Sequence, residues 1–117
     1  MPSFPKEERL CGKLATDRLL KGGKWGSCGH LKYCVLVRDA QSVPACSRLM
    51  VSVPKKLFRR AVKRNLLKRR LREAYRLQKA VLEGREEFFD ILLAYNSAEV
   101  AASDILHDEV GQILSRL

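Results

Sequence analysis

The stretch RLMVSVPKKLFRRAVKRNLLKRRLREAYRL, residues 48–77, contains the pattern from which the fold can be predicted. Its first residues, rich in apolar and β-branched side chains, predict a strand over Arg48–Val53. Pro54 ends that strand and can stand at the start of a helix. Ala, Leu, Lys and Arg then dominate, with no Gly or Pro before Gly84, so we expect a helix from about Lys55 to Leu82.

This predicted helix carries almost all of the net charge. Between Lys55 and Lys79 there are twelve Lys and Arg residues and one acid, Glu73, which gives +11. The whole chain has a net charge of +10, so the other 92 residues sum to −1. Such a concentrated charge repels itself, and a polyanion relieves that repulsion. Nucleic acid is therefore the leading partner class, and an anionic membrane surface is second because the helix lacks an opposing stripe of bulky insertion residues.

Two rows of residues run along the predicted helix at helical spacing. The first is apolar apart from one amide, and we expect it to face a sheet; it comprises Leu67, Leu71, Ala74, Gln78 and Val81. The second, called the ridge below, comprises Arg60, Arg64, Lys68, Arg72 and Arg76. Neighbours in the ridge are about 6 Å apart by helical rise, a spacing that suits an extended nucleic-acid strand. Guanidinium groups also bind phosphate in bidentate fashion.

Asn65 and Arg69 lie beside the ridge, one turn apart. The Asn65 amide can donate and accept hydrogen bonds, so it can bind a 2′-hydroxyl, a base edge or a metal-bound water.

Two other interpretations of the basic segment are a solvated charged helix and a nuclear-localisation tract. Solvated helices usually alternate charges of opposite sign, and a localisation tract needs no ordered apolar stripe, so neither accounts for both rows.

The rest of the chain divides into short elements at Gly, Pro and polar turn residues. Before the basic helix we expect an arm over residues 1–8, a helix over Arg9–Lys21 that is ended by Gly22 and Gly23, a loop over Lys24–His30, a strand over Leu31–Arg38 and a connection over Asp39–Ser47; the first helix has leucines at near-helical spacing, Leu10, Leu14, Leu19 and Leu20. After the basic helix we expect a strand over Phe88–Tyr95 and a turn at Asn96–Ser97. A last helix, capped by Ser103 or Asp104, then holds Ile105, Leu106, Val110, Ile113 and Leu114.

The order of these elements is α-β-β-α-β-α, which predicts one α+β domain of 117 residues with helices packed on a small, mostly antiparallel sheet. The short link between Leu31–Arg38 and Arg48–Val53 suggests that these two strands pair antiparallel. Phe88–Tyr95 is apolar nearly throughout, which favours the centre of the sheet.

Several classes of protein are disfavoured by the composition. No apolar run is long enough for a membrane span and no signal peptide is evident, so we expect a cytoplasmic protein. Its cysteines, Cys11, Cys28, Cys34 and Cys46, form no C-x-x-C pair and are predicted to be reduced, half-buried thiols. His30 and His107 lack partners at the spacing that a metal site or nuclease requires. Asp90 lies within an apolar run, and we expect a strand-edge or ion-paired carboxylate rather than a helper of metal-bound RNA. We predict no catalytic residue and no metal ligand.

The run Arg64-Asn65, Lys68-Arg69 and Arg72-Glu73, preceded by the pair Lys55-Lys56, resembles the signature of the bacterial ribonuclease P protein family. The resemblance is strong over 48–77 and looser over nearly all of the remaining chain. It implies a left-handed crossover between parallel strands, against the usual rule, and a shape similar to a domain of a small-subunit ribosomal protein. In the Arg-Asn-x motif of this chain, Leu66 stands where the family often has a further arginine.

The same resemblance implies a function. The basic helix would contact a catalytic RNA, and a cleft between the first helix and the sheet would hold the 5′ leader of precursor tRNA. Thr16 and Leu20 stand where the family often has phenylalanines, and Tyr33 or Trp25 are candidates to supply the stacking instead. The RNA subunit would carry out hydrolysis with Mg²⁺, with no cofactor held by the protein, no membrane and no protein partner required.

The RNA-binding residues predicted in this way are Lys55, Lys56, Arg60, Arg64, Asn65, Lys68, Arg69, Arg72 and Arg76. Two other functions remain open at this stage. One is a ribosomal or other structured-RNA-binding protein without a role in tRNA processing, which would share the basic helix. The other is a protein-only nuclease, which would need metal-dependent cleavage by the chain alone.

Overall fold

The computed structural model describes residues 10, 13–39, 47–82 and 87–117. The predicted arm over residues 1–8 and the proposed stop at Gly84 lie outside these residues. The elements in chain order are α1 (Lys13–Gly22), β1 (Lys24–Cys28), β2 (Leu31–Arg38), β3 (Arg48–Ser52), α2 (Ala61–Gln78), the 3₁₀ turn η2 (Lys79–Leu82), β4 (Phe88–Tyr95) and α3 (Ser103–Ser115). The α+β class is therefore confirmed, with one strand more than the predicted order.

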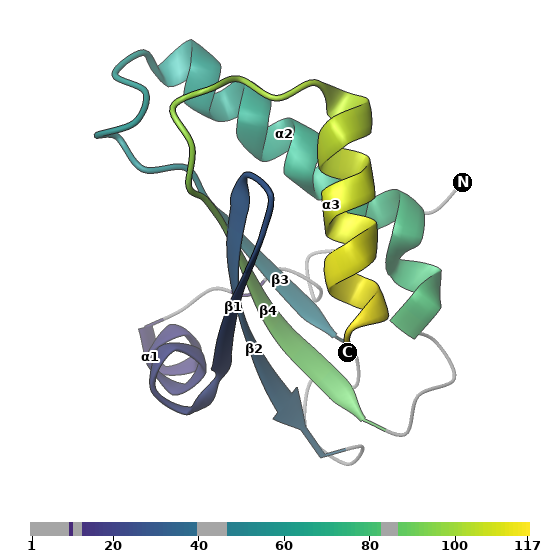
Figure 1. Cartoon of the computed structure of the whole chain (residues 1–117). Coiled ribbons are helices and arrows are strands. Elements are labelled where there is room, and N and C mark those ends of the chain that lie inside the picture. Colours follow the sequence, from purple (N-terminus) through teal and green to yellow (C-terminus); the bar gives the residue numbers. More distant parts are fainter. Residues whose placement is uncertain (1–9, 11–12, 40–46, 83–86) are drawn as a thin grey trace.

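The four strands form one sheet in the order β1-β2-β4-β3 (Figure 1). β4 pairs antiparallel with β2 and parallel with β3, and it is buried along most of its length. Its predicted central position is confirmed. The predicted antiparallel pairing of β2 with β3 is wrong, because the apolar β4 inserts between them and gains cover on both of its faces. β3, α2 and β4 form the parallel crossover that the family resemblance implies; its hand stays a prediction.

β1 is the strand that the sequence pattern did not predict, because Gly26 and Ser27 lower strand propensity and the segment was expected to be a loop. Pairing with β2 compensates for the low strand propensity of this segment. In that pairing Gly26 lies directly opposite Tyr33. A Cβ atom at position 26 would lie 2.5 Å from atoms of the Tyr33 ring, so glycine is needed where that ring lies on the strand. The tight turn to β2 uses Gly29, whose φ of +57° falls in the left-handed region.

Helices cover the two faces of the sheet unequally (Figure 1). α2 and α3 pack on one face around the larger core, which includes Leu31, Ile91, Leu93 and Tyr95. α1 packs on the other face, where Leu10, Leu19, Cys34 and Leu92 form a smaller cluster. Of the four leucines predicted on the first helix, Leu10 and Leu19 are buried, whereas Leu14 and Leu20 are exposed.

α2 begins at Ala61, later than the predicted start at Lys55. A turn occupies Lys55–Leu57 instead, and Arg60 is the residue before the helix, with extended backbone angles. The later start of α2 is explained by Phe58, whose ring is buried and packs edge to face against Tyr95 with the ring centroids 5.7 Å apart. Burying this ring favours the turn over another helical turn in water.

The apolar row of α2 is confirmed for its central members, because Leu67, Leu71 and Ala74 are buried in the core. Tyr75 is buried as well, which the two-row pattern did not predict. The amide of Gln78 donates to the carbonyl oxygen of His107 at 2.8 Å and so joins α2 to α3. The prediction for Val81 is wrong: it lies in η2 after the helix has tightened and is exposed.

α3 has no side-chain cap at its start. Its N-cap residue is Ala102, so the predicted cap by Ser103 or Asp104 is wrong. Four of the five apolar residues predicted on this helix are buried, namely Leu106, Val110, Ile113 and Leu114. The prediction for Ile105 is wrong, because this side chain is exposed. The thiols of Cys28 and Cys34 are free, as predicted, but they are buried rather than half-buried, and burial raises the pKa of Cys34. Cys11 and Cys46 lie outside the described residues.

Candidate nucleic-acid interface

The ridge occupies one flank of α2, beside the buried stripe. Arg64, Lys68, Arg72 and Arg76 follow one another at successive turns, and Arg60 precedes the first turn. Within the described chain, neither Lys68 nor Arg72 has an ion-pair or hydrogen-bond partner. Their charges are therefore presented to solvent without internal compensation, which is the condition for binding a polyanion.

Among the residues that the structure describes, Arg64 is held in place by backbone carbonyl groups and not by acids. Its Nη1 donates to the carbonyl oxygens of Phe58 and Arg59, both at 2.9 Å. These bonds close the turn before α2 and leave the positive charge uncancelled. Arg64 therefore joins the start of the helix to the ridge, and a substitution here would change both local structure and charge.

Arg76, at the other end of the ridge, has an internal partner. Its Nε and Nη2 donate to the Glu73 carboxylate one turn away. The hydrogen bond from Arg76 lowers the pKa of the Glu73 carboxyl, and the same bond raises the pKa of Arg76. The single acid of the helix thus offsets one ridge cation, whereas Arg64, Lys68 and Arg72, which precede this acid, have no acidic partner within the described chain.

The other predicted RNA-binding residues lie around the ridge. Lys55 and Lys56 are exposed in the turn before α2, and Asn65 is exposed on the helix. Arg69 is also exposed, but it lies along the groove that separates α2 from α3. The structure therefore places the turn lysines and Asn65 near the N-terminal end of the ridge, whereas Arg69 lies at the edge of the α2–α3 groove.

Arg70 is a basic residue with a structural contact that the sequence did not reveal. Its Nη1 donates to the carbonyl oxygen of Ala101 at 2.6 Å, which ties α2 to the segment before α3. It stands two residues from both Lys68 and Arg72, so it points about 200° around the helix axis from each. This angle was a signal, available in the sequence, that Arg70 does not belong to the ridge.

The three predicted leader-cleft residues do not share one surface. Thr16 and Leu20 lie on α1, on one side of the sheet. Tyr33 packs against the core on the opposite side, and its hydroxyl bonds to Arg116 at 3.2 Å. Tyr33 therefore cannot line a cleft between α1 and the sheet, because side chains of neighbouring strand positions alternate between the faces.

Of the two aromatic candidates for stacking, Trp25 is the one that the structure places on the α1 side. It pairs with Cys34, which packs beneath α1, so the two side chains share a face. The ring is 49% exposed, and the Lys32 ammonium lies 5.1 Å from its centroid. This exposed ring with an adjacent cation has the chemistry of a base-stacking position.

Comparisons with known proteins identify the family of this chain. A family model described as Ribonuclease P matches residues 4–117. Proteins described as "Ribonuclease P protein component" are similar to this chain. The one from Ralstonia pickettii is 35% identical over 116 residues, covering 95% of this chain and 79% of that protein. The one from Porphyromonas gingivalis is 66% identical over 38 residues, a match that spans only 28% of that protein.

Solved structures show the same fold. The RNase P protein from Thermotoga maritima superposes with a TM-score of 0.75 at 24% identity, covering 94% of this chain and 97% of that one. A mutant RNase P protein from Staphylococcus aureus, described as defective in mRNA degradation activity, gives a TM-score of 0.76 at 22% identity, covering 95% and 88%. Among the residues described for this chain, no helix has the length and apolar character of a bilayer span. The chain belongs to the ribonuclease P protein family.

Proposed function

We propose that this chain is the protein subunit of a ribonuclease P ribonucleoprotein, which binds the catalytic RNA and helps remove the 5′ leader from precursor tRNA. The observation that carries the proposal is the pair of uncompensated cations, Lys68 and Arg72, in line with Arg64 on a helix whose adjacent stripe is buried. Family membership supplies the RNA partner, and the charge supplies the means of binding it.

The chain's own contribution is electrostatic and positional. The turn lysines, Asn65 and the ridge would hold the RNA backbone, so that the substrate and the RNA subunit meet with less repulsion between their phosphates. Hydrolysis would belong to the RNA subunit, with Mg²⁺ bound there. Thr16 and Leu20 on α1, with Trp25 on the adjoining sheet face, are the residues we assign to the leader.

Reconstitution tests this proposal. The full chain is added to a bacterial ribonuclease P RNA and a precursor tRNA with a 5′ leader, at a Mg²⁺ concentration where the RNA alone cleaves slowly. We expect cleavage at the mature 5′ end to accelerate, and the Lys68→Ala, Arg72→Ala double variant to require more protein for the same rate. Lys24→Ala, which removes an exposed cation on the far edge strand, is the matched control.

The outcome also separates the alternatives. No acceleration by the wild-type chain would refute the proposal. Equal affinity of the reconstituted particle for precursor and mature tRNA would favour a general structured-RNA-binding protein. Cleavage by the purified chain without any RNA subunit would instead indicate a protein-only nuclease.

A further inference from the structure

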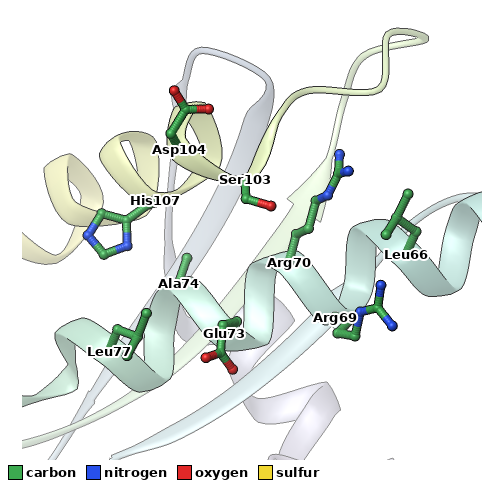
Figure 2. A pocket seen from close by; sticks show the side chains of 9 residues that line it. All are labelled: Leu66, Arg69, Arg70, Glu73, Ala74, Leu77, Ser103, Asp104 and His107. Carbon is green, nitrogen blue, oxygen red and sulfur yellow. The ribbon is translucent and has the colours of Figure 1, made fainter.

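A hollow of about 540 Å³ lies between α2 and α3 (Figure 2). We call it the α2–α3 pocket. Side chains from both helices line it, among them Leu66, Arg69, Arg70, Leu77, Ser103 and His107. Nothing in the proposed role of the ridge uses this pocket, and its lining is neither purely apolar nor purely charged.

One end of the pocket is cationic. Arg69 is exposed there without an internal partner in the described chain, and Arg70 uses Nη1 for the Ala101 carbonyl while a guanidinium carries five N–H donors in all. α3 also begins at this end, and its N-cap Ala102 provides no side-chain hydrogen bond. The first amides of the helix and the two arginines therefore favour one negatively charged group.

The other end is suited to a flat, neutral group. Leu77 is 47% exposed, and Ala74 forms a buried floor beside it. The half-buried imidazole of His107 extends from α3 over this region (Figure 2) and has no hydrogen-bond partner within the described residues. A histidine ring above an aliphatic floor is an arrangement on which an unstacked base can lie, and the ring nitrogens can bond its edge.

The acidic side chains of the pocket limit how much negative charge a bound ligand can carry. The Glu73 carboxylate is engaged by Arg76, and the Asp104 carboxylate points away from Ala74 and Leu77 in Figure 2. Both nevertheless oppose a compact, multiply charged anion. A ligand with a single negative charge at one end and a neutral aromatic body at the other fits better, and a phosphodiester-linked nucleotide has this form.

The length of the pocket agrees with that assignment. Arg69 and Leu77 are eight residues apart on α2, which corresponds to about 12 Å of helical rise. We propose that the α2–α3 pocket binds one unstacked nucleotide of a single-stranded RNA, with the phosphodiester at Arg69 and Arg70 and the base between His107 and Leu77. This site needs no catalytic RNA subunit and lies between α2 and α3, beside the ridge, so it goes beyond the function proposed above.

Chemical-shift mapping on the ¹⁵N-labelled full chain tests the site directly. The probes are inorganic phosphate, adenosine 5′-monophosphate and a single-stranded hexa-adenylate RNA. We expect the amides of Leu77, Ser103 and His107 to shift with both nucleotide probes, and the hexamer to bind at least fivefold more tightly than phosphate. Shifts confined to the ridge, or equal affinity for phosphate and hexamer at these amides, would overturn the proposal. Binding of the monophosphate alone would overturn the assignment to an RNA strand.

Two variants with a matched control make the test specific. Leu77→Glu places a negative charge in the apolar end and should weaken hexamer binding at the Ser103 amide at least fivefold. Val81→Glu makes the same kind of change at a similarly exposed residue outside the pocket and should stay within twofold. His107→Ala, which adds no charge, should weaken binding at least threefold and serves if Leu77→Glu folds poorly. Unchanged affinity in His107→Ala would contradict the proposed base contact, whereas the reconstituted cleavage assay would be unaffected by that failure.

Discussion

The Arg48 guanidinium holds both oxygens of the Asp90 carboxylate, with Nε to Oδ1 at 2.9 Å and Nη2 to Oδ2 at 2.7 Å. Arg38 reaches the same carboxylate from the other neighbouring strand, with Nε to Oδ1 at 2.8 Å. Asp90 is 1% exposed, so these bonds replace the hydration that burial removes. One carboxylate thus ties β2, β4 and β3 together. Of the two alternatives expected for Asp90, the ion-paired carboxylate is confirmed and the strand-edge carboxylate is wrong.

Replacing Asp90 with Asn should lower the free energy of unfolding by about 3 kcal/mol, because two half-buried guanidinium groups lose their common counter-charge. Urea denaturation at neutral pH measures this change. Asp108→Asn, at an exposed position on α3, should change the same quantity by no more than about 0.5 kcal/mol. Equal midpoints for Asp90→Asn and wild type would show that the three-strand cluster does not stabilise the sheet.

The buried stripe of α2 can be tested at Leu71, whose side chain is fully buried. Leu71→Ala should cost about 2–4 kcal/mol, because the transfer free energy of the removed atoms is forfeited and a cavity is left behind. Val62→Ala removes methyl groups from a side chain that is 79% exposed and should cost no more than about 0.5 kcal/mol. A wild-type melting temperature for Leu71→Ala would contradict the position of this residue in the core.

The ridge predicts a specific salt dependence of RNA binding. In the Lys68→Ala, Arg72→Ala double variant, the log–log slope of affinity against salt should flatten by about 0.7–0.9 for each phosphate that the variant no longer neutralises. Filter binding over a range of salt concentrations provides the slope. Arg64 is a less clean choice, because its bonds to Phe58 and Arg59 also hold the start of α2. A slope equal to that of wild type would mean that RNA binds to another surface.

His30 predicts how stability depends on pH. It lies in the β1–β2 turn, where its Nδ1 is 2.7 Å from an oxygen of the buried Glu109 carboxylate on α3. Its other charged neighbour is Glu99, at 3.7 Å from Nε2, and the ring stacks on Tyr95. The hydrogen bond with Glu109 raises the pKa of His30 above the ordinary value of 6.5, against the opposing effect of burial.

Because the folded-state pKa is the higher one, the protonated imidazole stabilises the fold. This contribution is complete below pH 6.5 and is lost as the pH rises through the folded-state pKa. Urea midpoints at pH 5.5 and 8.5 should therefore differ in favour of the lower pH, and His30→Gln should reduce that difference. His107→Gln is the control and should leave the difference as in wild type. An identical difference in His30→Gln would contradict the assigned role of the turn histidine.

The sequence alone determined the elements whose signal is local. The bounds of β2 and β4, the helical segment from Ala61 to Gln78 and its two rows follow from runs and periods that a short window contains. The ridge was predictable for the same reason, since spacing of four residues places side chains on one flank whatever the helix packs against.

Tertiary structure decided what depends on residues far apart in the chain. The sequence did not show that β4 separates β2 from β3, because pairing is chosen by which strand gains cover on both faces. It did not show β1, which is stable only against β2, or the turn before α2, which exists because Phe58 packs on Tyr95. Packing between elements far apart in the chain also decided that Tyr33 lies on the face of the sheet away from α1 and that Arg69 lies along the groove beside α3.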